Sequence, residues 1–574
     1  MSNGDFMFFS KFLFVVFILF CFYTSCVSAD ASNKSGFAVC GIENAIDNKV
    51  GGSDLLSSLV KVKGARYLKS ISNNLEGNEK YSHFYNKVAG RREQVYIFDG
   101  AGYLYALNPL TSDNVFIYDT NFIIGEIKNN PDEGVFYKEP VEPVVADIYD
   151  GLEWRTILVL TSSSGKGIFV FDITDPDAVT LLWKVKGETD ATHTSDFKLG
   201  NSIGRPTVAR LHNGEWAIVV GNGYGALDSE SGAAALYMFN AVNGTLISTL
   251  EVHSGLGEPN GLSSPRLADY DGDGIADYAY AGDLHGNLWR FDLLGDGATP
   301  PSVSLGNGYY GANSGTTNRF QVSYGGQPMF VAKASGSNTR QPIVAAPSLV
   351  RHPTGKGHLV IFGTGLNVSM VEGIAEQQYT HSLYGIWDLQ TAAEATKSNN
   401  ISYDQLTLQS IAKKITGIEG SDERQREARV ISNNPVEWYT NFDSTQVVNR
   451  RGWYLDFQVK GISGGEMLVD DMRTLGSMLL LQTLTPKNDP CNNSFITWLY
   501  AINPQTGGRT AHQAFGLHDI EHDGVTGIKF GQPGPIVLLH NEQGFKVEAA
   551  DESVAIIPPP QSWGRQSWRM LSDP

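Results

Sequence analysis

The chain has 574 residues, of which 62 are glycine and only 18% are charged, and its 61 acidic and 43 basic side chains give a net charge of −18. That negative charge argues against a nucleic-acid partner, because phosphate binding needs a basic face, and it argues against docking on an anionic lipid surface. With 41% hydrophobic and 11% aromatic residues, the composition is that of a globular protein, and the abundant glycine favours short strands joined by tight turns.

Residues 1–29 are predicted to be a secretory signal peptide. Lys11 is followed by an apolar run from Phe12 to Tyr23 and then by Val27-Ser28-Ala29, an order typical of a cleaved signal. The run is shorter than the roughly 20 residues that span a bilayer. We expect cleavage after Ala29, export of the chain, and no transmembrane segment in the mature form; an uncleaved anchor is the alternative.

Residues 30–90 form an N-terminal segment that contains Cys40. Cleavage of the signal removes Cys21 and Cys26, so Cys40 and Cys491 remain. In an exported chain these two residues can form one disulfide, which would restrict the unfolded chain over a very long loop. Two separate thiols, or a bond to another chain, stay open as alternatives.

From residue 91 to residue 574 the chain repeats one small unit. In each unit an apolar strand leads through a Gly-rich connection or a longer insertion into a second strand that closes on Asp or Asn, which is typical of a β-hairpin. The six first and second strands are Val95–Ile97 and Tyr103–Asn108, Ile157–Leu160 and Ile168–Asp172, Ala217–Val220 and Ala235–Asn240, Asp277–Ala281 and Leu288–Asp292, His358–Phe362 and Ser382–Asp388, and Met478–Gln482 and Thr497–Asn503.

One hairpin cannot bury both of its faces, so repetition around an axis is expected to bury them. We therefore predict an all-β fold, a modified β-propeller of about six to eight blades with loop insertions. A string of β-sandwiches is the competing interpretation, and the lack of Pro/Ser-rich linkers between the units counts against it.

One segment, residues 269–277, has the ligand spacing of a calcium loop. Asp269, Asp271, Asp273 and Asp277 occupy loop positions 1, 3, 5 and 9, and Ile275 offers its backbone carbonyl at position 7. Calcium prefers six to eight oxygen ligands, and Gly274 permits the sharp turn. The alternative is a solvated acidic turn. Without calcium, we expect repulsion among the carboxylates to open the loop and alter the surface beside the Asp283–Asn287 turn.

The segment that directly follows this loop, residues 281–293, resembles the signature of the PilY family of type IV pilus assembly proteins. Further matches follow in the family's order, at residues 172–176, 221–224, 341–343, 362–365, 384–388, 452–456 and 567–569. The resemblance covers roughly residues 90–570 and implies a C-terminal β-propeller with calcium at the 269–277 loop. Longer members carry a large N-terminal region, whereas here about 60 residues separate the signal from the first unit, so the resemblance implies a short form that lacks that region and the roles that rest on it.

The resemblance implies a pilus biogenesis factor that binds calcium and is not an enzyme. It would promote assembly or oppose retraction, and so affect twitching motility, at the outer cell surface, where it would contact minor pilins at the pilus tip and support adhesion to host or abiotic surfaces. One alternative is a periplasmic oxidoreductase, because quinoprotein-like propellers hold a quinone with calcium on the propeller axis. A lectin-like binding propeller is the other.

Overall fold

The computed structural model describes residues 67–71, 94–98, 103–107, 114–119, 143–161, 167–175, 178–187, 198–200, 204–224, 233–270, 272–294, 320–366, 380–389, 401–419, 425–439, 448–459, 461–486, 495–517, 524–531, 536–541, 544–549 and 552–558. The signal segment, Cys40, Asp271, Cys491 and residues 567–569 lie outside these described residues. Within them, no helix has both the length and the apolar character that crossing a bilayer requires.

The first four sheets are antiparallel meanders, and we number them blades 1 to 4 in chain order. Blade 1 contains β1 (Tyr67–Ile71), β2 (Gln94–Phe98), β3 (Tyr103–Leu107) and β4 (Asn114–Asp119). Blade 2 contains β5 (Val144–Tyr149), β6 (Trp154–Thr161), β7 (Gly167–Asp172) and β8 (Thr180–Lys186). Blade 3 contains β9 (Thr207–Arg210), β10 (Trp216–Gly221), β11 (Ala233–Asn240) and β12 (Leu246–His253). Blade 4 contains β13 (Arg266–Ala268), β14 (Tyr278–Gly282), β15 (Asn287–Leu293), β16 (Phe320–Val322) and β17 (Phe330–Val331), with the short turn α5 (Ser323–Gly326) between the last two.

Blades 5 and 6 belong to one eleven-stranded sheet, and blade 7 is a separate three-stranded sheet. Blade 5 contains β18 (Ser348–Arg351), β19 (His358–Gly363), β20 (Ser382–Asp388) and β23 (Gly452–Val459), with β24 (Ile462–Ser463) paired to β23. Blade 6 contains β25 (Arg473–Leu475), β26 (Met478–Pro486), β27 (Phe495–Ile502) and β28 (Gly527–Lys529). Blade 7 contains β29 (Val537–Asn541), β30 (Gly544–Ala549) and β31 (Glu552–Ile556).

A long hairpin connects blades 5 and 6 through the backbone. After the short 3-10 turn η6 (Tyr403–Gln405), β21 (Leu406–Glu419) runs parallel to β23 of blade 5, and β22 (Gln425–Ile431) returns antiparallel to β21 and pairs with β28 of blade 6. The two four-stranded blades therefore become a single hydrogen-bonded sheet. The sequence pattern did not predict this hairpin.

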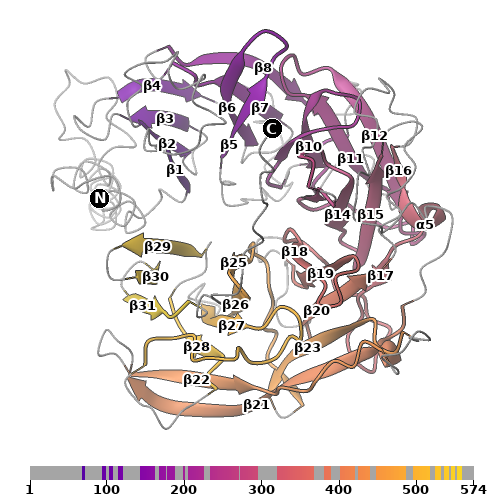
Figure 1. Cartoon of the computed structure of the whole chain (residues 1–574), viewed down its shortest axis with the longest axis vertical. Coiled ribbons are helices and arrows are strands. Elements are labelled where there is room, and N and C mark those ends of the chain that lie inside the picture. The colour runs from indigo at the N-terminus through magenta and orange to yellow at the C-terminus, as the bar shows by residue number, and fades with distance from the viewer. Residues whose placement is uncertain are drawn as a thin grey trace, which may run out of the picture.

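All six hairpins expected from the sequence are present as antiparallel pairs, namely β2–β3, β6–β7, β10–β11, β14–β15, β19–β20 and β26–β27. Figure 1 shows the sheets following one another around a ring, from indigo to yellow in chain order. The described part of the chain is thus a β-propeller with seven blades, within the expected range.

The central strands read as continuous apolar runs because both of their faces are buried. In β6, Ile157 and Val159 pack into a cluster shared with blade 3, while Leu158 and Leu160 pack into a cluster shared with blade 1. Alternate side chains point to opposite faces of a strand, so each inner strand packs against two neighbours. Every pair of successive blades shares such a cluster, and the interpretation as separate β-sandwiches is therefore wrong.

The first blade begins earlier than the sequence pattern predicted. β1 (Tyr67–Ile71) lies within the N-terminal segment assigned to residues 30–90, yet it pairs antiparallel with β2 in blade 1. Twenty-two residues separate the two strands, so no short Gly-rich turn marked them as a hairpin. The boundary expected at residue 91 therefore falls inside blade 1.

A buried ion pair joins blades 4 and 5. Arg290 on β15 donates from Nη1 to both carboxylate oxygens of Asp388 on β20, at 3.1 and 2.9 Å, and neither side chain is exposed. The hydroxyls of Tyr280 and Tyr324 also donate to Asp388, at 2.7 and 2.8 Å. Burial alone would raise the pKa of Asp388, but Arg290 and the two hydroxyls outweigh it and hold that pKa below its ordinary value. Asp388 therefore stays ionised between the two blades.

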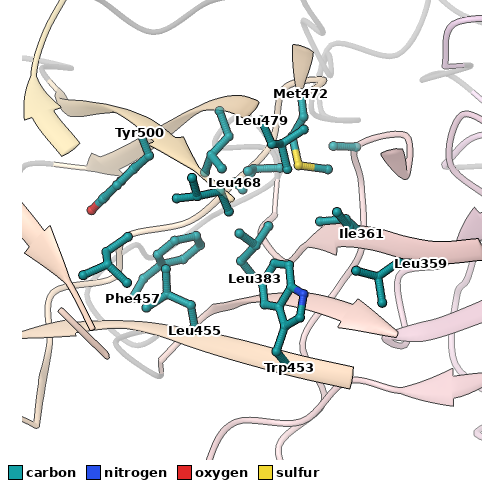
Figure 2. Packing of buried hydrophobic residues seen from close by; sticks show 14 of the residues in the cluster. Leu359, Ile361, Leu383, Trp453, Leu455, Phe457, Leu468, Met472, Leu479 and Tyr500 are labelled. Atoms are coloured by element: carbon teal, nitrogen blue, oxygen red, sulfur yellow. The ribbon is translucent and has the colours of Figure 1, made fainter. Parts of the chain in front are cut away.

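A fully buried tryptophan joins blades 5 and 6. The Trp453 ring lies among the aliphatic side chains that the two blades share, and Figure 2 shows it below Leu383. A Cβ atom on Gly385 or on Gly507 would come within 2.4 or 2.2 Å of this ring, so both positions must lack a side chain. The indole N–H donates to the Pro504 carbonyl at 3.1 Å. Trp453 of blade 5 thus packs closely against the turn after β27 in blade 6.

Blade 5 also contains a histidine whose charge state should make stability depend on pH. His352 is buried and stacks on Trp387, with 3.8 Å between ring centroids and 3° between planes. Burial lowers the pKa of His352 to about 3. In the unfolded chain a histidine takes up its proton at about pH 6.5. The free energy of unfolding should therefore decrease as the pH falls from about 6.5 towards 3, because only the unfolded state is protonated in that window.

Urea unfolding measured across this pH window checks the expectation. The variant His352→Phe keeps an aromatic ring on Trp387 but cannot titrate, so its stability should depend less steeply on pH than that of the wild type. The variant His253→Phe, at an exposed position of β12, should keep the wild-type slope. Equal slopes for wild type and His352→Phe would contradict the prediction.

Candidate metal centre

The predicted calcium loop connects β13 to β14 in blade 4. Of the five proposed ligands, the structure describes Asp269, Asp273, Ile275 and Asp277, whereas Asp271 lies outside the described residues. The side chains of Asp269 and Asp273 are exposed, and those of Ile275 and Asp277 are buried. The loop therefore begins at the surface and ends in the core between blades.

The first half of the loop folds around the Asp269 carboxylate. Its oxygens accept hydrogen bonds from the backbone N–H groups of Gly272 at 2.7 Å, Asp273 at 3.2 Å and Gly274 at 2.8 Å. Gly272 and Gly274 have φ values of +81° and +86°, a region that glycine enters without strain. The sharp turn expected at Gly274 is thus observed, and Gly272 makes a second one.

Asp277 anchors the end of the loop inside the protein. Its side chain is 1% exposed, and its carboxylate accepts hydrogen bonds from the Tyr270 backbone N–H at 2.7 Å and from His212 Nε2 at 2.9 Å. Burial raises the pKa of Asp277, although the bonds from His212 and Tyr270 oppose that rise. His212 lies in the turn between β9 and β10 of blade 3.

No pattern in the sequence points to His212. It stands 65 positions before Asp277 and belongs to no metal-binding spacing. Only the packing of blade 3 against blade 4 brings the two residues together. A spacing search along one segment cannot find such a contact.

The donor chemistry of the loop fits calcium. Asp269, Asp273 and Asp277 supply carboxylate oxygens and Ile275 supplies a backbone carbonyl, and hard oxygen donors of this kind suit Ca²⁺ better than a metal that prefers thiolate or imidazole. A carboxylate has about four acceptor positions, so the N–H bonds above leave room for an ion. Within the part of the chain that the structure describes, no three His, Cys, Asp or Glu side chains form a metal-holding cluster. The proposed set needs Asp271 to complete it.

The expectation that the loop adjoins the Asp283–Asn287 turn is wrong. The loop ends where β14 begins, at Tyr278, and the turn follows Gly282 at the other end of the same strand. Five extended residues span roughly 16 Å. The turn is instead closed by Asp283, whose buried carboxylate accepts hydrogen bonds from the backbone N–H groups of His285 and Asn287 and from side chains that include Trp289. Opening of the loop would therefore change a different edge of blade 4.

Comparison with known proteins gives one consistent family. Residues 133–417 match the family model of the PilY1 beta-propeller domain. A protein of Pseudomonas aeruginosa named type IV pilus biogenesis factor PilY1 is 38% identical over 545 residues, which cover 91% of this chain and 46% of that protein. A Xylella fastidiosa protein named as a homolog of this factor is 27% identical over 455 residues, covering 76% of this chain and 28% of its own length. The chain thus spans less than half the length of these relatives.

Among solved structures, the crystal structure of the Pseudomonas aeruginosa PilY1 C-terminal domain is similar to this chain. It has 36% sequence identity and a TM-score of 0.70, and the match covers 84% of this chain and 96% of that domain. The sequence match and the shared propeller agree with the resemblance found in the ordered motifs. The chain therefore belongs to the PilY1 family.

Proposed function

We propose that this chain is a type IV pilus biogenesis factor that binds calcium and has no catalytic role. The observation that carries the proposal is the 38% identity over 91% of the chain to a protein named as such a factor. The proposed place of action is the outer cell surface after export, where the propeller would contact minor pilins at the pilus tip, promote assembly or oppose retraction, and support adhesion.

The arrangement of the loop favours a binding role over the oxidoreductase alternative. A cofactor calcium on a propeller axis would draw ligands from several blades, whereas Asp269, Asp273, Ile275 and Asp277 all come from one connection in blade 4. The relatives are named as pilus factors, and those names support neither the enzyme nor the lectin-like alternative.

Calcium at this loop would act as a switch on pilus dynamics. The ion would neutralise carboxylates that otherwise repel one another within nine residues. Extracellular calcium modules commonly bind at about 10⁻⁴–10⁻³ M, close to the calcium concentration that exported proteins meet, so occupancy of the loop would vary with its surroundings. The loop residues can respond only to the extent that the ion binds their ordered arrangement more tightly than the open one.

The variant Asp271→Ala tests the proposal. It should lose calcium binding, measured by titration calorimetry up to the millimolar range, while its circular dichroism spectrum stays that of the folded propeller. Surface piliation and twitching should change in a strain that can retract its pili. Piliation compared with and without the retraction ATPase separates an effect on assembly from an effect on retraction.

The matched control is Glu258→Ala, which removes one exposed carboxylate from the connection between β12 and β13. It should leave calcium binding and piliation unchanged. Normal piliation and twitching in Asp271→Ala, with calcium binding shown to be lost, would mean that the ion is only structural. A wild-type protein that binds no calcium would remove the metal from the proposal and leave the pilus role to be tested by gene deletion.

A further inference from the structure

The 269–277 loop contacts the blades on both sides of its own. Towards blade 3, the Ala276 backbone N–H donates to the Arg210 carbonyl at 2.9 Å, and Arg210 and Ile275 form a parallel β-bridge. Arg210 is the last residue of β9 and lies two residues before His212, which the following turn supplies to Asp277. The end of β9 and the end of the loop are therefore held together by main chain and side chain at once.

The side-chain contact is made by two buried polar groups. His212 is 0% exposed and Asp277 is 1% exposed, with 2.9 Å between Nε2 and Oδ1. As a metal-ligating carboxylate Asp277 can only accept, so in the proposed site the Nε2–H of His212 is the donor. Because a buried carboxylate is costly unless it is hydrogen-bonded, the bond from His212 helps to hold the Asp277 carboxylate in one orientation. Its imidazole thus orients a proposed metal ligand from the neighbouring blade.

Towards blade 5, the contact runs through Tyr270. Its ring meets the His358 ring edge-on, at 5.5 Å between centroids and 74° between planes, and it packs on the cluster that blades 4 and 5 share. The backbone N–H of Tyr270 donates to the other oxygen of Asp277 at 2.7 Å. One carboxylate therefore receives a hydrogen bond from blade 3 and a second from a residue that packs on blade 5.

We propose that the loop is a joint between blades 3, 4 and 5, with His212 as the positioning residue that ties Asp277 to blade 3. The inference rests on the calcium site proposed above and extends the effect of the ion from blade 4 to blades 3 and 5. Ordering of the loop fixes Asp277, and Asp277 in turn fixes the β9–β10 turn and the Tyr270 ring. Loss of a hydrogen-bonding partner behind a metal ligand commonly weakens metal affinity by about 10–100-fold.

Hydrogen exchange on the wild-type chain, with and without saturating calcium, provides the first test. A joint predicts that calcium slows exchange in peptides covering β9 and its turn (residues 207–216) and the start of β19 near His358, in addition to residues 266–282. Protection confined to residues 266–282 would overturn the proposal. A wild-type chain with no calcium binding would overturn the calcium site itself, which calorimetry recognises separately.

Two substitutions of His212 provide the second test. His212→Ala removes the donor, and we expect a loss of calcium affinity of about 10–100-fold together with loss of the calcium-dependent protection of residues 207–216. Protection of residues 272–277 at saturating calcium should persist. His212→Gln retains an N–H donor and should recover part of both losses. His253→Ala, at an exposed position of the same blade, should behave as wild type.

Wild-type affinity and an unchanged exchange pattern in His212→Ala would overturn the proposal. If His212→Ala fails to fold, Tyr270→Leu tests the proposal through the contact with blade 5. It removes the ring that contacts His358 but keeps the backbone N–H that Asp277 accepts. Loss of calcium-dependent protection near His358, with protection of residues 207–216 kept, supports the joint, and unchanged protection near His358 contradicts it.

Discussion

Asp388→Ala should reduce the free energy of unfolding by about 3–5 kcal/mol, the usual effect of removing one partner from a buried ion pair. The substitution leaves the Arg290 guanidinium without its main counter-charge at a position with no exposure to water. It also removes the acceptor of the Tyr280 and Tyr324 hydroxyls. Burial of the unpaired donors adds to this cost, and the remaining ion pair of Arg290 with Asp292, at 3.1 Å, offsets it only in part.

The measurement is the shift of the urea midpoint at constant slope. Glu427→Ala provides the control, because Glu427 pairs with Lys414 at 2.5 Å and with Lys529 at 3.3 Å, but the three side chains keep 32%, 46% and 43% of their surface exposed. Exposed pairs contribute about 0–1 kcal/mol, so this variant should stay close to wild type. An Asp388→Ala midpoint no lower than that of Glu427→Ala would contradict the prediction.

Trp453→Ala is expected to cost about 3–5 kcal/mol as well, for a different reason. The ring is fully buried and fills the space left by two glycines of different blades, Gly385 and Gly507. Its removal opens a large cavity that the rigid β-sheets on either side cannot close. Because the ring belongs to blade 5 and one of its glycines to blade 6, the loss should appear as weaker packing between those blades.

Gly385→Ala tests the same contact from the opposite side, since its Cβ would approach the ring to 2.4 Å and force it to move. Both variants should therefore lower the midpoint and speed hydrogen exchange in β20 and β23. The control is Trp154→Ala, at a ring that is 36% exposed. Equal losses for Trp453→Ala and Trp154→Ala would show that Trp453 has no special role between the blades.

Much of the fold followed from local pattern because the inner strands are largely apolar and most of their connections are short and rich in glycine. The six strand pairs and their circular repetition needed no other information. The β21–β22 hairpin was not predicted, because the second half of β21 is mostly exposed and contains no apolar run that would indicate a buried strand. Strand β1 was not predicted because its partner β2 follows only after a connection of 22 residues.

Two of the family motifs contain residues that contact a neighbouring blade. Asp388 closes the motif at residues 384–388 and binds Arg290 of blade 4, while Trp453 belongs to the motif at residues 452–456 and packs on blade 6. The contacts of Asp388 and Trp453 with neighbouring blades explain why these residue types stand at these positions, so the two motifs reflect the fold that the family shares. The metal loop could be proposed from spacing alone, since all its proposed ligands are close in sequence. His212 could not, because only the folded ring brings it to Asp277.

The backbone connection between blades 5 and 6 has a mechanical consequence. A tensile force across these two blades must break a series of parallel and antiparallel hydrogen bonds along β23, β21, β22 and β28. The contact between blades 3 and 4 has isolated main-chain bonds, such as Ala276 to Arg210, alongside its side-chain packing. Under load, the ring should therefore separate first where two blades are joined by side-chain packing and isolated main-chain bonds, as blades 3 and 4 are, while blades 5 and 6 move as one rigid unit.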